Sequence, residues 1–551
     1  MVLTKNADLL FLPLGGVGEI GMNLAVYGYG AENKREWLII DMGVCFAGSD
    51  IPGANLILPD ISFLEGQRHN ISGLVLTHAH EDHFGAVPFL WPKLQVPIYC
   101  TAFTAALLEN RREGDFDCRK VPLNIFRGGE KFHVGSYEVE SISVAHSIPD
   151  SVSLSIRTPL GTIIHTGDWK IDEVLTDEQR FRSLGEEGVL ALVCDSTNAL
   201  CESSGFSEAK VAQTLQKILA DARGCVAIST FASNVARIKS IALAADTLGK
   251  RVLLLGRSMK RTLALAEELG YLKGIRPFLD EEDYELISRD KVVLLLTGSQ
   301  GEPQAALAKL ARNEKGSIRL GAGDILVFSS RNIPGNEKAI LNIQNSLIDQ
   351  GVQIITDRDM CVHVSGHPYP CHLKQMYRWV NPKILIPVHG EASHLVAHAA
   401  LGKEAGIQKV LQARNGRILR LAPGEPGVID QIPMRRIYKD GNLMGDEESL
   451  GISTRRKLSY VGHVVVSLFF DGSYGLAGPV KLILLGLPKI DSRGRFLDSL
   501  LLKSIENAIN NMPRQHRKDH IVCRAIRKVV SSLVYDFWGK KTIVDICMHH
   551  H

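Results

Sequence analysis

A dense run of metal-ligand side chains lies near residue 80. The run reads Thr77-His78-Ala79-His80-Glu81-Asp82-His83. The apolar residues before it predict a strand, and side chains two positions apart in extended chain point the same way. His78 and His80 are therefore expected to face one metal ion. Asp82 and His83 come where the chain turns into a predicted helix, and we expect them to face a second ion.

A metal site needs ligands from other parts of the chain, and three polar residues follow predicted strands. His146 comes after a strand over residues 138–144, Asp168 after 162–165 and His389 after 384–388. Each alone is as compatible with an ordinary polar residue as with a ligand. Mixed imidazole and carboxylate ligands suit zinc, although manganese would tolerate the same oxygens. Two such ions can activate water and clamp a phosphoryl group.

The elements that carry these residues predict an α/β fold with an insertion. Residues 1–206 alternate short apolar strands with turns and a few helices. From 207 to 356 longer helices separate strands in the pattern of a parallel sheet. The earlier pattern of short apolar strands and turns returns over residues 357–433. We therefore expect one layered α/β domain that is interrupted by an inserted α/β domain.

The C-terminal part differs in charge from the rest. Residues 434–450 are polar and turn-rich, which predicts a linker, and 451–551 predict a small α+β domain. The domain contains 16 Lys and Arg against 7 Asp and Glu, a net of +9 within a chain of net +3. A basic domain on an acidic body fits a polyanionic partner or a solvated surface about equally. The helix predicted over 498–511 is apolar beyond what two strands can cover, which predicts a homodimer or larger even-numbered assembly.

The remaining composition excludes several classes of protein. No apolar run approaches the roughly 18 residues of a membrane span, and the start of the chain does not resemble a signal peptide. None of the ten cysteines forms a Cys-x-x-Cys pair, which favours a reducing compartment, and we expect the cytoplasm. His549–His551 is compatible with either a native end or a purification tag.

The order of the ligand-type residues resembles the metallo-β-lactamase fold, an αββα sandwich. Asp41 matches the first motif of that fold, residues 78–83 the second, His146 the third and Asp168 the fourth. The resemblance implies one zinc held by the first two histidines of the run and His146. It implies a second zinc held by the aspartate and histidine that close the run. Asp168 would bridge the two ions, and Asp41 would orient the histidine loop.

The insertion is typical of the β-CASP branch, which acts on nucleic acids. Asp195, His367 and His389 resemble its three motifs, so His389 is expected as a further ligand. Three strings resemble the bacterial ribonuclease J family: residues 14–23, 231–234 and 333–337. Ala79, where glycine is common, and residues 368–371 depart from that pattern. The resemblance covers nearly the whole chain.

The ribonuclease J resemblance implies an RNA hydrolase in RNA maturation and decay, including rRNA processing and mRNA decay. It implies 5′-to-3′ exonuclease activity on 5′-monophosphate RNA together with endonuclease activity. The expected cofactor is two Zn²⁺ per subunit, with Mn²⁺ as the alternative. The expected partners are RNA, further copies of the chain in a homodimer or homotetramer, and other RNA-decay proteins.

The catalytic roles follow from the needs of phosphodiester hydrolysis. The departing 3′-oxygen must be protonated or stabilised, and His367 is the candidate acid, with Asp195 orienting it. Asp82 is counted as catalytic because it would hold the metal. Ser233, Asn234 and Ser365, with His367, would bind an RNA phosphate through side chains and backbone N–H groups. As ordinary turn and capping residues, the first three would need no ligand.

Three alternative functions remain to be weighed. Gly16-Val17-Gly18-Glu19-Ile20-Gly21 fits a dinucleotide-binding fingerprint, but residues 22–27 alternate as a strand where that fingerprint requires a helix. A hydrolase of a non-nucleic-acid ester or thioester would need neither the insertion nor the basic C-terminal domain. A non-catalytic RNA-binding scaffold would not need the complete ligand set.

Overall fold

The computed structural model describes residues 7–48, 50–111, 117–202, 205–333, 335–473 and 475–550. Pro334, from one of the family-like strings, and His551, from the histidine end, lie outside these ranges. The chain divides into two compact units, Met1–Phe46 with Leu56–Ile437 and Ala47–Asn55 with Tyr438–His551. The first unit contains all the candidate metal ligands.

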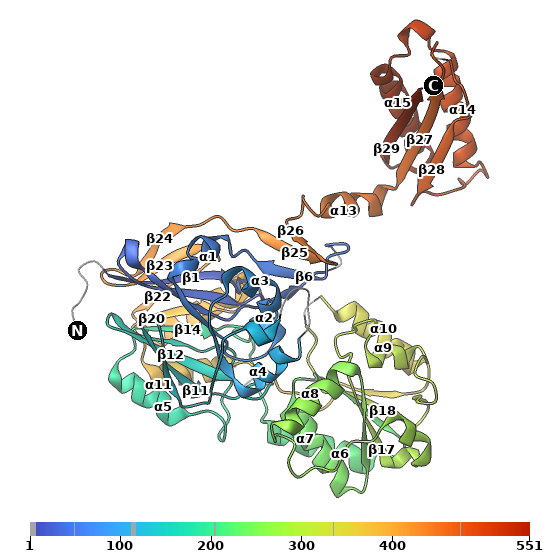
Figure 1. Ribbon diagram of the computed structural model, residues 1–551. Helices are drawn as coiled ribbons and strands as arrows, with labels where there is room; N and C mark the ends of the chain where they lie inside the picture. The colour runs from blue at the N-terminus through green and yellow to red at the C-terminus, as the bar shows by residue number, and fades with distance from the viewer. Residues whose placement is uncertain are drawn as a thin grey trace. The chain divides into compact units, whose positions relative to one another are not determined.

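Two β-sheets form the centre of the first unit (Figure 1). In spatial order, the eight-stranded sheet contains β24 (Gly427–Gln431), β23 (Arg417–Ala422), β1 (Asp8–Gly15), β3 (Leu24–Gly30), β4 (Glu36–Ile40), β7 (Ile71–Val75), β8 (Ile98–Thr101) and β9 (Leu123–Phe126). The seven-stranded sheet contains β10 (Lys131–Val134), β11 (Tyr137–Ser143), β12 (Val152–Thr158), β13 (Gly161–His165), β14 (Ala191–Asp195), β20 (Ile384–Val388) and β22 (Lys409–Val410). The two sheets therefore carry every strand after which a ligand was predicted.

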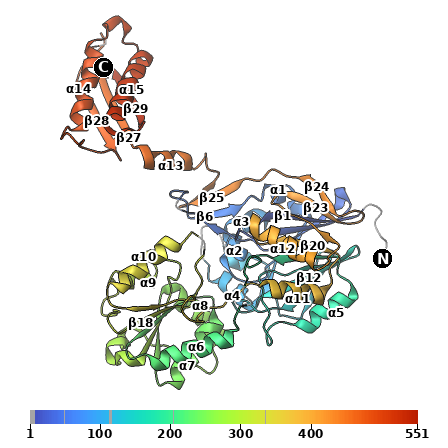
Figure 2. The ribbon, with the colours of Figure 1, turned by 180° about the vertical axis from the view of Figure 1, so that it is seen from behind.

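The sheets share one apolar core and are covered by helices on their outer faces. Phe11 and Leu38 of the first sheet pack with Leu154 and Ile386 of the second, all fully buried. The helices α3 (Val87–Leu94) and α4 (Ala102–Glu109) pack on the outer side of the first sheet. The helices α5 (Glu178–Glu187) and α11 (Pro370–Val380) cover the second (Figure 2). Alternating strand residues thus face either the shared core or a helix layer, and the predicted αββα sandwich is confirmed.

The inserted block is a parallel sheet between two helix layers. Its strands, in spatial order, are β16 (Arg251–Leu255), β17 (Val292–Leu296), β15 (Val226–Ser229), β18 (Ile325–Phe328) and β19 (Gln353–Ile355). The helices α6 (Glu208–Asp221), α7 (Val235–Thr247) and α8 (Arg257–Glu268) pack on one face. The other face holds α9 (Ala306–Ala311) and α10 (Glu337–Ile348). The strands are apolar on both sides, as expected of a parallel sheet buried on both faces.

The glycine-rich segment near the N-terminus does not have the structure of a dinucleotide-binding loop. Val17–Gly18 forms the short strand β2, which pairs with β21 (Gly390–Glu391), and β3 follows where the fingerprint requires a helix. A Cβ at Gly16 would lie 2.2 Å from Asn23 Oδ1, so the close return of the chain requires glycine there. The structure therefore argues against the oxidoreductase alternative.

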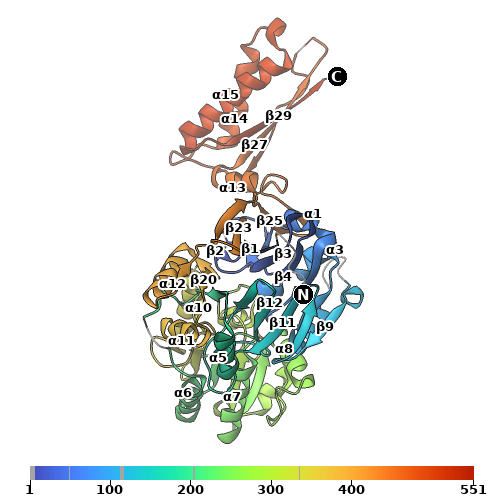
Figure 3. The same ribbon diagram turned by 90° about the vertical axis from the view of Figure 1, so that its left-hand side faces the viewer.

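The second unit contains the C-terminal α+β domain (Figure 3). A three-stranded sheet, β28 (Lys481–Leu485), β27 (His463–Phe470) and β29 (Ile543–His550), packs one face against α14 (Leu497–Asn510) and α15 (Asp519–Trp538). His549 and His550 lie within β29. The helix α13 (Ile452–Val461) precedes β27. Part of the expected linker is ordered, because β25 (Arg436–Asp440) and β26 (Leu443–Gly445) pair as a hairpin.

The apolar stripe of α14 is covered within its own domain. Leu501 and Ile505 are fully buried against the sheet and α15. The stripe therefore gives no surplus apolar surface for a second subunit, which corrects the physical reason for the assembly prediction. In the same domain Arg517 is buried, whereas Arg524 and Arg527 are exposed. Among the described residues, none of the helices has the length and apolar character needed to cross a bilayer.

Candidate metal centre

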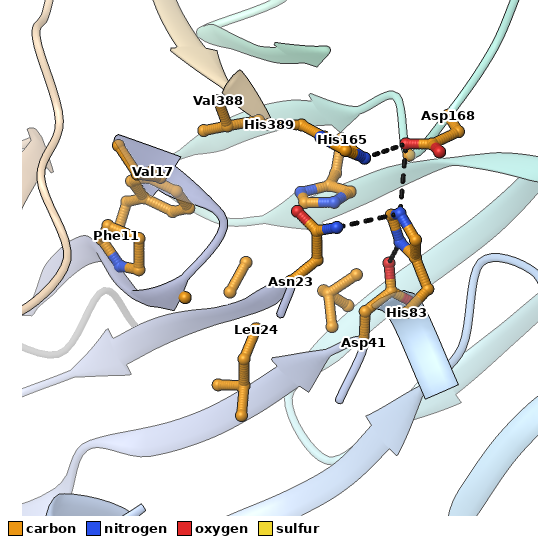
Figure 4. Close-up of a pocket in the computed structure, with 15 residues that line it drawn as sticks. Phe11, Val17, Asn23, Leu24, Asp41, His83, His165, Asp168, Val388 and His389 are labelled. Carbon is orange, nitrogen blue, oxygen red and sulfur yellow. Dashed lines mark hydrogen bonds and ion pairs between the residues drawn. The ribbon is translucent and has the colours of Figure 1, made fainter. Parts of the chain in front are cut away.

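The strands of the sandwich bring all seven predicted metal ligands to one edge. The run from His78 follows β7, His146 follows β11, Asp168 follows β13 and His389 follows β20. His389 has a φ of 51°, and Asp41, after β4, has a φ of 62°. Non-glycine residues adopt this left-handed region at an energetic cost of order 1 kcal/mol, which the surrounding structure must offset. Both side chains turn toward the site (Figure 4).

His78, His80, His146 and Asp168 form the first cluster. One ligand atom from each lies within 4.8 Å of all the others. His146 Nε2 is 2.9 Å from His80 Nδ1 and 3.5 Å from Asp168 Oδ2. His78 Nε2 is 3.7 Å from the same Asp168 oxygen. Three imidazoles and one carboxylate oxygen thus converge on a single point, as the spacing of the run predicted.

Asp82, His83, His389 and again Asp168 form the second cluster. His83 Nε2 and His389 Nε2 each lie 3.2 Å from Asp168 Oδ1. His389 Nε2 is 3.3 Å from Asp82 Oδ2. Asp168 therefore presents one carboxylate oxygen to each cluster, which is the geometry of a ligand bridging two ions.

The unpartnered atoms of the clusters fit metal ions. His78 Nε2, His389 Nε2 and Asp168 Oδ1 are buried without a hydrogen bond, although a buried polar atom normally has one. Zinc ligands lie roughly 2.0–2.2 Å from the ion, so tetrahedral neighbours are about 3.3–3.5 Å apart. The separations of 3.2 to 3.7 Å around Asp168 match that spacing. The donor set fits two ions of the zinc or manganese type.

Hydrogen bonds outside the clusters orient the ligands. Asp41 accepts from Thr77 N and Thr77 Oγ1, both at 2.8 Å, and lies 2.7 Å from His83 Nδ1. Ser233 Oγ is 3.1 Å from His80 Nε2, and His146 Nδ1 donates to Gly366 O at 2.8 Å. Each contact occupies the ring nitrogen that faces away from the cluster. In His80 and His146 the other nitrogen is left with a lone pair for a metal.

The electrostatics keep three imidazoles neutral. Burial, followed by the nearby His83, lowers the pKa of His78 well below its ordinary value. Burial is also the main reason that the pKa of His80 falls to about 4 and that of His146 falls well below normal. These imidazoles can therefore bind a cation without first losing a proton.

The carboxylates have the opposite effect on the second cluster. Burial lowers the pKa of His83 and His389, but the surrounding carboxylates, of which Asp168 has the largest effect, together outweigh burial and raise both well above normal. Although burial opposes ionisation, the imidazoles of His389 and His83 hold the pKa of Asp168 well below its usual range. Metal binding at this cluster must therefore displace protons, so it should strengthen as pH rises.

His367 and Asp195 lie beside the two clusters. His367 Nδ1 is 2.8 Å from Asp195 Oδ2, and Asp195 Oδ1 accepts from Thr197 N at 2.8 Å. The His367 side chain is 22% exposed, so a substrate can reach it. Burial lowers the pKa of His367, but the carboxylates of Asp195 and Asp168 outweigh burial and raise it. The ring is therefore equipped to donate a proton at neutral pH.

The three phosphate-binding candidates already have contacts within the protein. Ser233 holds His80, as described above. The Asn234 side chain accepts from Arg237 N and caps α7. Ser365 Oγ accepts from Asn198 Nδ2 at 2.9 Å and from His367 N at 3.2 Å. Asn234 and Ser365 thus make the contacts of turn and capping residues, which was the alternative for all three, whereas Ser233 contacts a candidate ligand.

Asn23 and His165 are site residues that sequence reasoning missed. Asn23 Nδ2 is 3.0 Å from His83 Nε2, and His165 Nδ1 is 2.9 Å from Tyr27 Oη. Both line a recess of about 370 Å³ beside the second cluster, part of which is open to solvent (Figure 4). Asn23 ends the quoted glycine-rich string and His165 lies three residues before Asp168. Those positions were the only signal in the sequence.

Four family models match the chain. The beta-lactamase superfamily domain matches residues 37–185, and the model described as ribonuclease J, beta-CASP domain, matches 223–347. The Zn-dependent metallo-hydrolase RNA specificity domain matches residues 351–412. The ribonuclease J C-terminal domain matches residues 450–551.

Several proteins are similar over nearly their whole length. Ribonuclease J of Sinorhizobium meliloti is 53% identical, covering 99% of this chain and 98% of its own. Ribonuclease J of Mycobacterium tuberculosis is 36% identical over 98% and 97%, and that of Thermus thermophilus 35% over 83% and 81%. A crystal structure of a protein of unknown function from Enterococcus faecalis V583 shares the fold, with a TM-score of 0.53 at 15% identity over 75% of this chain and 100% of that one.

Proposed function

The chain belongs to the ribonuclease J family, and on that premise we propose that it hydrolyses RNA phosphodiester bonds at the two clusters that share Asp168. The shared carboxylate is the observation that carries the proposal, because it joins two ligand sets of the kind that phosphodiester hydrolysis uses. The match to an RNA specificity domain favours RNA over an ester or thioester. The complete ligand set argues against a scaffold without activity.

Two zinc ions per chain are the proposed cofactor, with manganese as the alternative. His78, His80 and His146 would hold one ion and Asp82, His83 and His389 the other, with Asp168 contributing to both. When bound, the ions neutralise phosphoryl oxygens and lower the pKa of water. The protein's own part is to fix these ligands, and Asp41 does so by its contacts to Thr77 and His83.

His367 is proposed to protonate the departing 3′-oxygen of the RNA. Its Nδ1 is held by Asp195, and Asp195 in turn is held by Thr197. Asp195 therefore orients the ring and favours its protonated form. The proposed role of Asp82 is to hold the second ion, and no separate proton transfer is assigned to it.

RNA ends should be distinguished by their 5′ phosphates. We expect 5′-monophosphate RNA to be degraded from 5′ to 3′ into mononucleotides, whereas 5′-triphosphate RNA should show mainly internal cuts. A 5′-triphosphate that fits the site poorly would lose at least one charge-assisted hydrogen bond. That loss costs about 1.5–3 kcal/mol, or roughly tenfold to a hundredfold in rate. Labelled RNAs that differ only in the 5′ end, with products resolved by length, measure this. Equal exonuclease rates on both ends would remove the proposed 5′ selectivity but not the nuclease.

Ser233, Asn234 and Ser365 are proposed to bind phosphate through the backbone of their turns and not through their side chains. Their side chains are occupied by protein contacts, so the backbone N–H groups of the two turns, with His367, are the proposed phosphate donors. Ser365→Ala should therefore change the Kd for RNA little, although it should disturb the turn that positions His367.

A homodimer or homotetramer is proposed, with the C-terminal domain contributing to assembly. The sheet face turned away from α14 and α15 exposes Ile483 and Leu485, each 56% exposed. Exposed apolar side chains on neighbouring strand positions are typical of an association surface. Deleting residues 446–551 should lower the oligomeric state and weaken processing of long RNA while sparing the metal clusters. Light scattering that finds the full chain monomeric at micromolar concentration would contradict this.

The cellular setting is proposed from the same family. The ten cysteines contain no Cys-x-x-Cys pair, which fits a reducing compartment such as the cytoplasm. There the protein would act in rRNA maturation and mRNA decay, and other RNA-decay proteins are its proposed partners.

A further inference from the structure

A buried ion network lies where the insertion meets the sandwich. Arg237, in the first turn of α7, has 1% of its side chain exposed. Its guanidinium donates to both carboxylate oxygens of Glu208 at 2.8 Å. Lys170 Nζ donates to the same carboxylate at 2.9 Å, and the Lys170 side chain is 7% exposed. Burying charged groups is costly unless pairing and hydrogen bonds compensate, so this network should have a function that offsets its cost.

Arg237 also holds the segment that returns from the insertion. Its guanidinium donates to His363 Nδ1 at 3.0 Å, to Val364 O at 3.4 Å and to Ser329 O at 3.2 Å. Burial, and then the Arg237 charge, lower the pKa of His363 to about 3. His363 is therefore neutral and accepts this hydrogen bond. One side chain thus ties α7, the end of β18 and residues 363–364 together.

Two of these segments, and the loop that carries Lys170, lead to the first cluster. Ser233, just before α7, lies 3.1 Å from His80 Nε2. Gly366, two residues after Val364, accepts from His146 Nδ1 at 2.8 Å. Lys170 lies two residues after Asp168. The network therefore connects to three of the four ligands of the first cluster, each through a short piece of chain.

We propose that Arg237, together with Glu208 and Lys170, is a positioning residue that sets the geometry of the first ligand cluster from the inserted domain. It touches no reacting atom and acts through Ser233, Gly366 and the Asp168 loop. Among the described residues, the ligands that belong to the second cluster alone have no such contact with the insertion, since Asp82 and His83 are held by Asn23 and Asp41. The effect on RNA cleavage rests on the proposed function, whereas the effect on metal binding does not.

A matched control is available in the same unit. Arg180 forms a two-pronged pair with Glu140, at 2.6 and 2.8 Å, between α5 and β11. Its other contacts are to Ser183 and Glu187 on its own helix. Removing this pair deletes an ion pair of the same type that makes no contact with Ser233, Gly366 or Lys170.

Metal binding gives the first test. Full-length Arg237→Met, Arg237→Lys and Glu208→Gln proteins, freed of metal, are titrated with Zn²⁺ against a chelator, and their Co²⁺ forms are compared by visible absorption. Loss of an outer contact to a ligand typically weakens metal binding about 10–100-fold. We expect that loss for one of the two equivalents, with an altered Co²⁺ spectrum. Arg237→Lys, which keeps the charge, should be affected less, and Arg180→Met should match the unaltered protein.

Kinetics give the second test. With both sites saturated by metal, Arg237→Met and Glu208→Gln should lower kcat about tenfold or more while KM changes little, because the RNA-binding surface is intact. Folded Glu208→Gln protein with unaltered metal affinity, Co²⁺ spectrum and kcat would overturn the proposal. This isosteric variant decides the matter even if Arg237→Met fails to fold. If the unaltered protein binds metal but cleaves no RNA, the proposed function fails and the metal titration still tests the positioning role.

Discussion

Replacing Asp168 with asparagine is expected to lower RNA cleavage by about a thousandfold or more. Asp168 gives Oδ2 to the first cluster and Oδ1 to the second, so the amide removes the negative charge that both clusters share and replaces one of the two ligand oxygens with an NH₂ group, which cannot bind a metal. Metal ions contribute several kcal/mol of transition-state stabilisation, and each 1.36 kcal/mol is about tenfold in rate. Elemental analysis should show loss of both metals. Asp82→Ala and His83→Ala should each lose chiefly one.

Binding of RNA separates this effect from a general loss of structure. It rests mainly on basic residues outside the clusters, so fluorescence anisotropy should give a Kd close to that of the unaltered protein. Asp60→Asn is the control, because Asp60 is also buried but only accepts from Ser62 at the start of α1 (Ser62–Gly66). Chelation should abolish cleavage reversibly. Cleavage at the normal rate by protein shown to lack metal would refute the proposed mechanism.

Replacing His367 with glutamine is expected to lower cleavage about 10²–10⁴-fold, the usual contribution of a general acid. The loss should depend on the leaving group. In RNA whose scissile 3′-oxygen is replaced by sulfur, the thiolate departs without protonation, so His367→Gln should recover most of its rate. Asp168→Asn is the control and should not recover. A His367→Gln deficit that is equal on both substrates would exclude the proton-donor role.

The pH dependence gives a second measurement of the same role. A general acid must be protonated, so the rate it supports is present below its pKa and is lost as pH rises through that value. The Asp195 carboxylate raises the pKa of His367. Asp195→Asn should therefore move the alkaline decline in kcat to lower pH. The direction holds with metals bound, since the comparison removes only the Asp195 charge. An unchanged decline in Asp195→Asn would contradict the pairing.

The sequence by itself predicted that His78 and His80 face one ion and that Asp82 and His83 face another. His78 and His80 are two residues apart in extended chain, and Asp82 and His83 follow in the turn that starts α2 (Glu81–Phe84). Such local geometry depends on backbone periodicity alone, so it can be read without the rest of the fold. The alternating and helical apolar patterns predicted a layered α/β domain with an insertion for the same reason, whereas the αββα order came from the resemblance to the metallo-β-lactamase fold.

The tertiary structure alone decided what holds those ligands in place. His80 meets Ser233 from 153 residues away, and His146 meets Gly366 from 220 residues away. Nothing in the local pattern at either end specifies such a pair, because the contact exists only after the inserted domain packs on the sandwich. The folded chain also gives the Ser365 side chain a partner in Asn198, 167 residues away. Packing within the C-terminal domain buries the α14 stripe that had suggested a subunit contact. Sequence periodicity fixes which face of an element is apolar, whereas only the folded chain determines what covers that face.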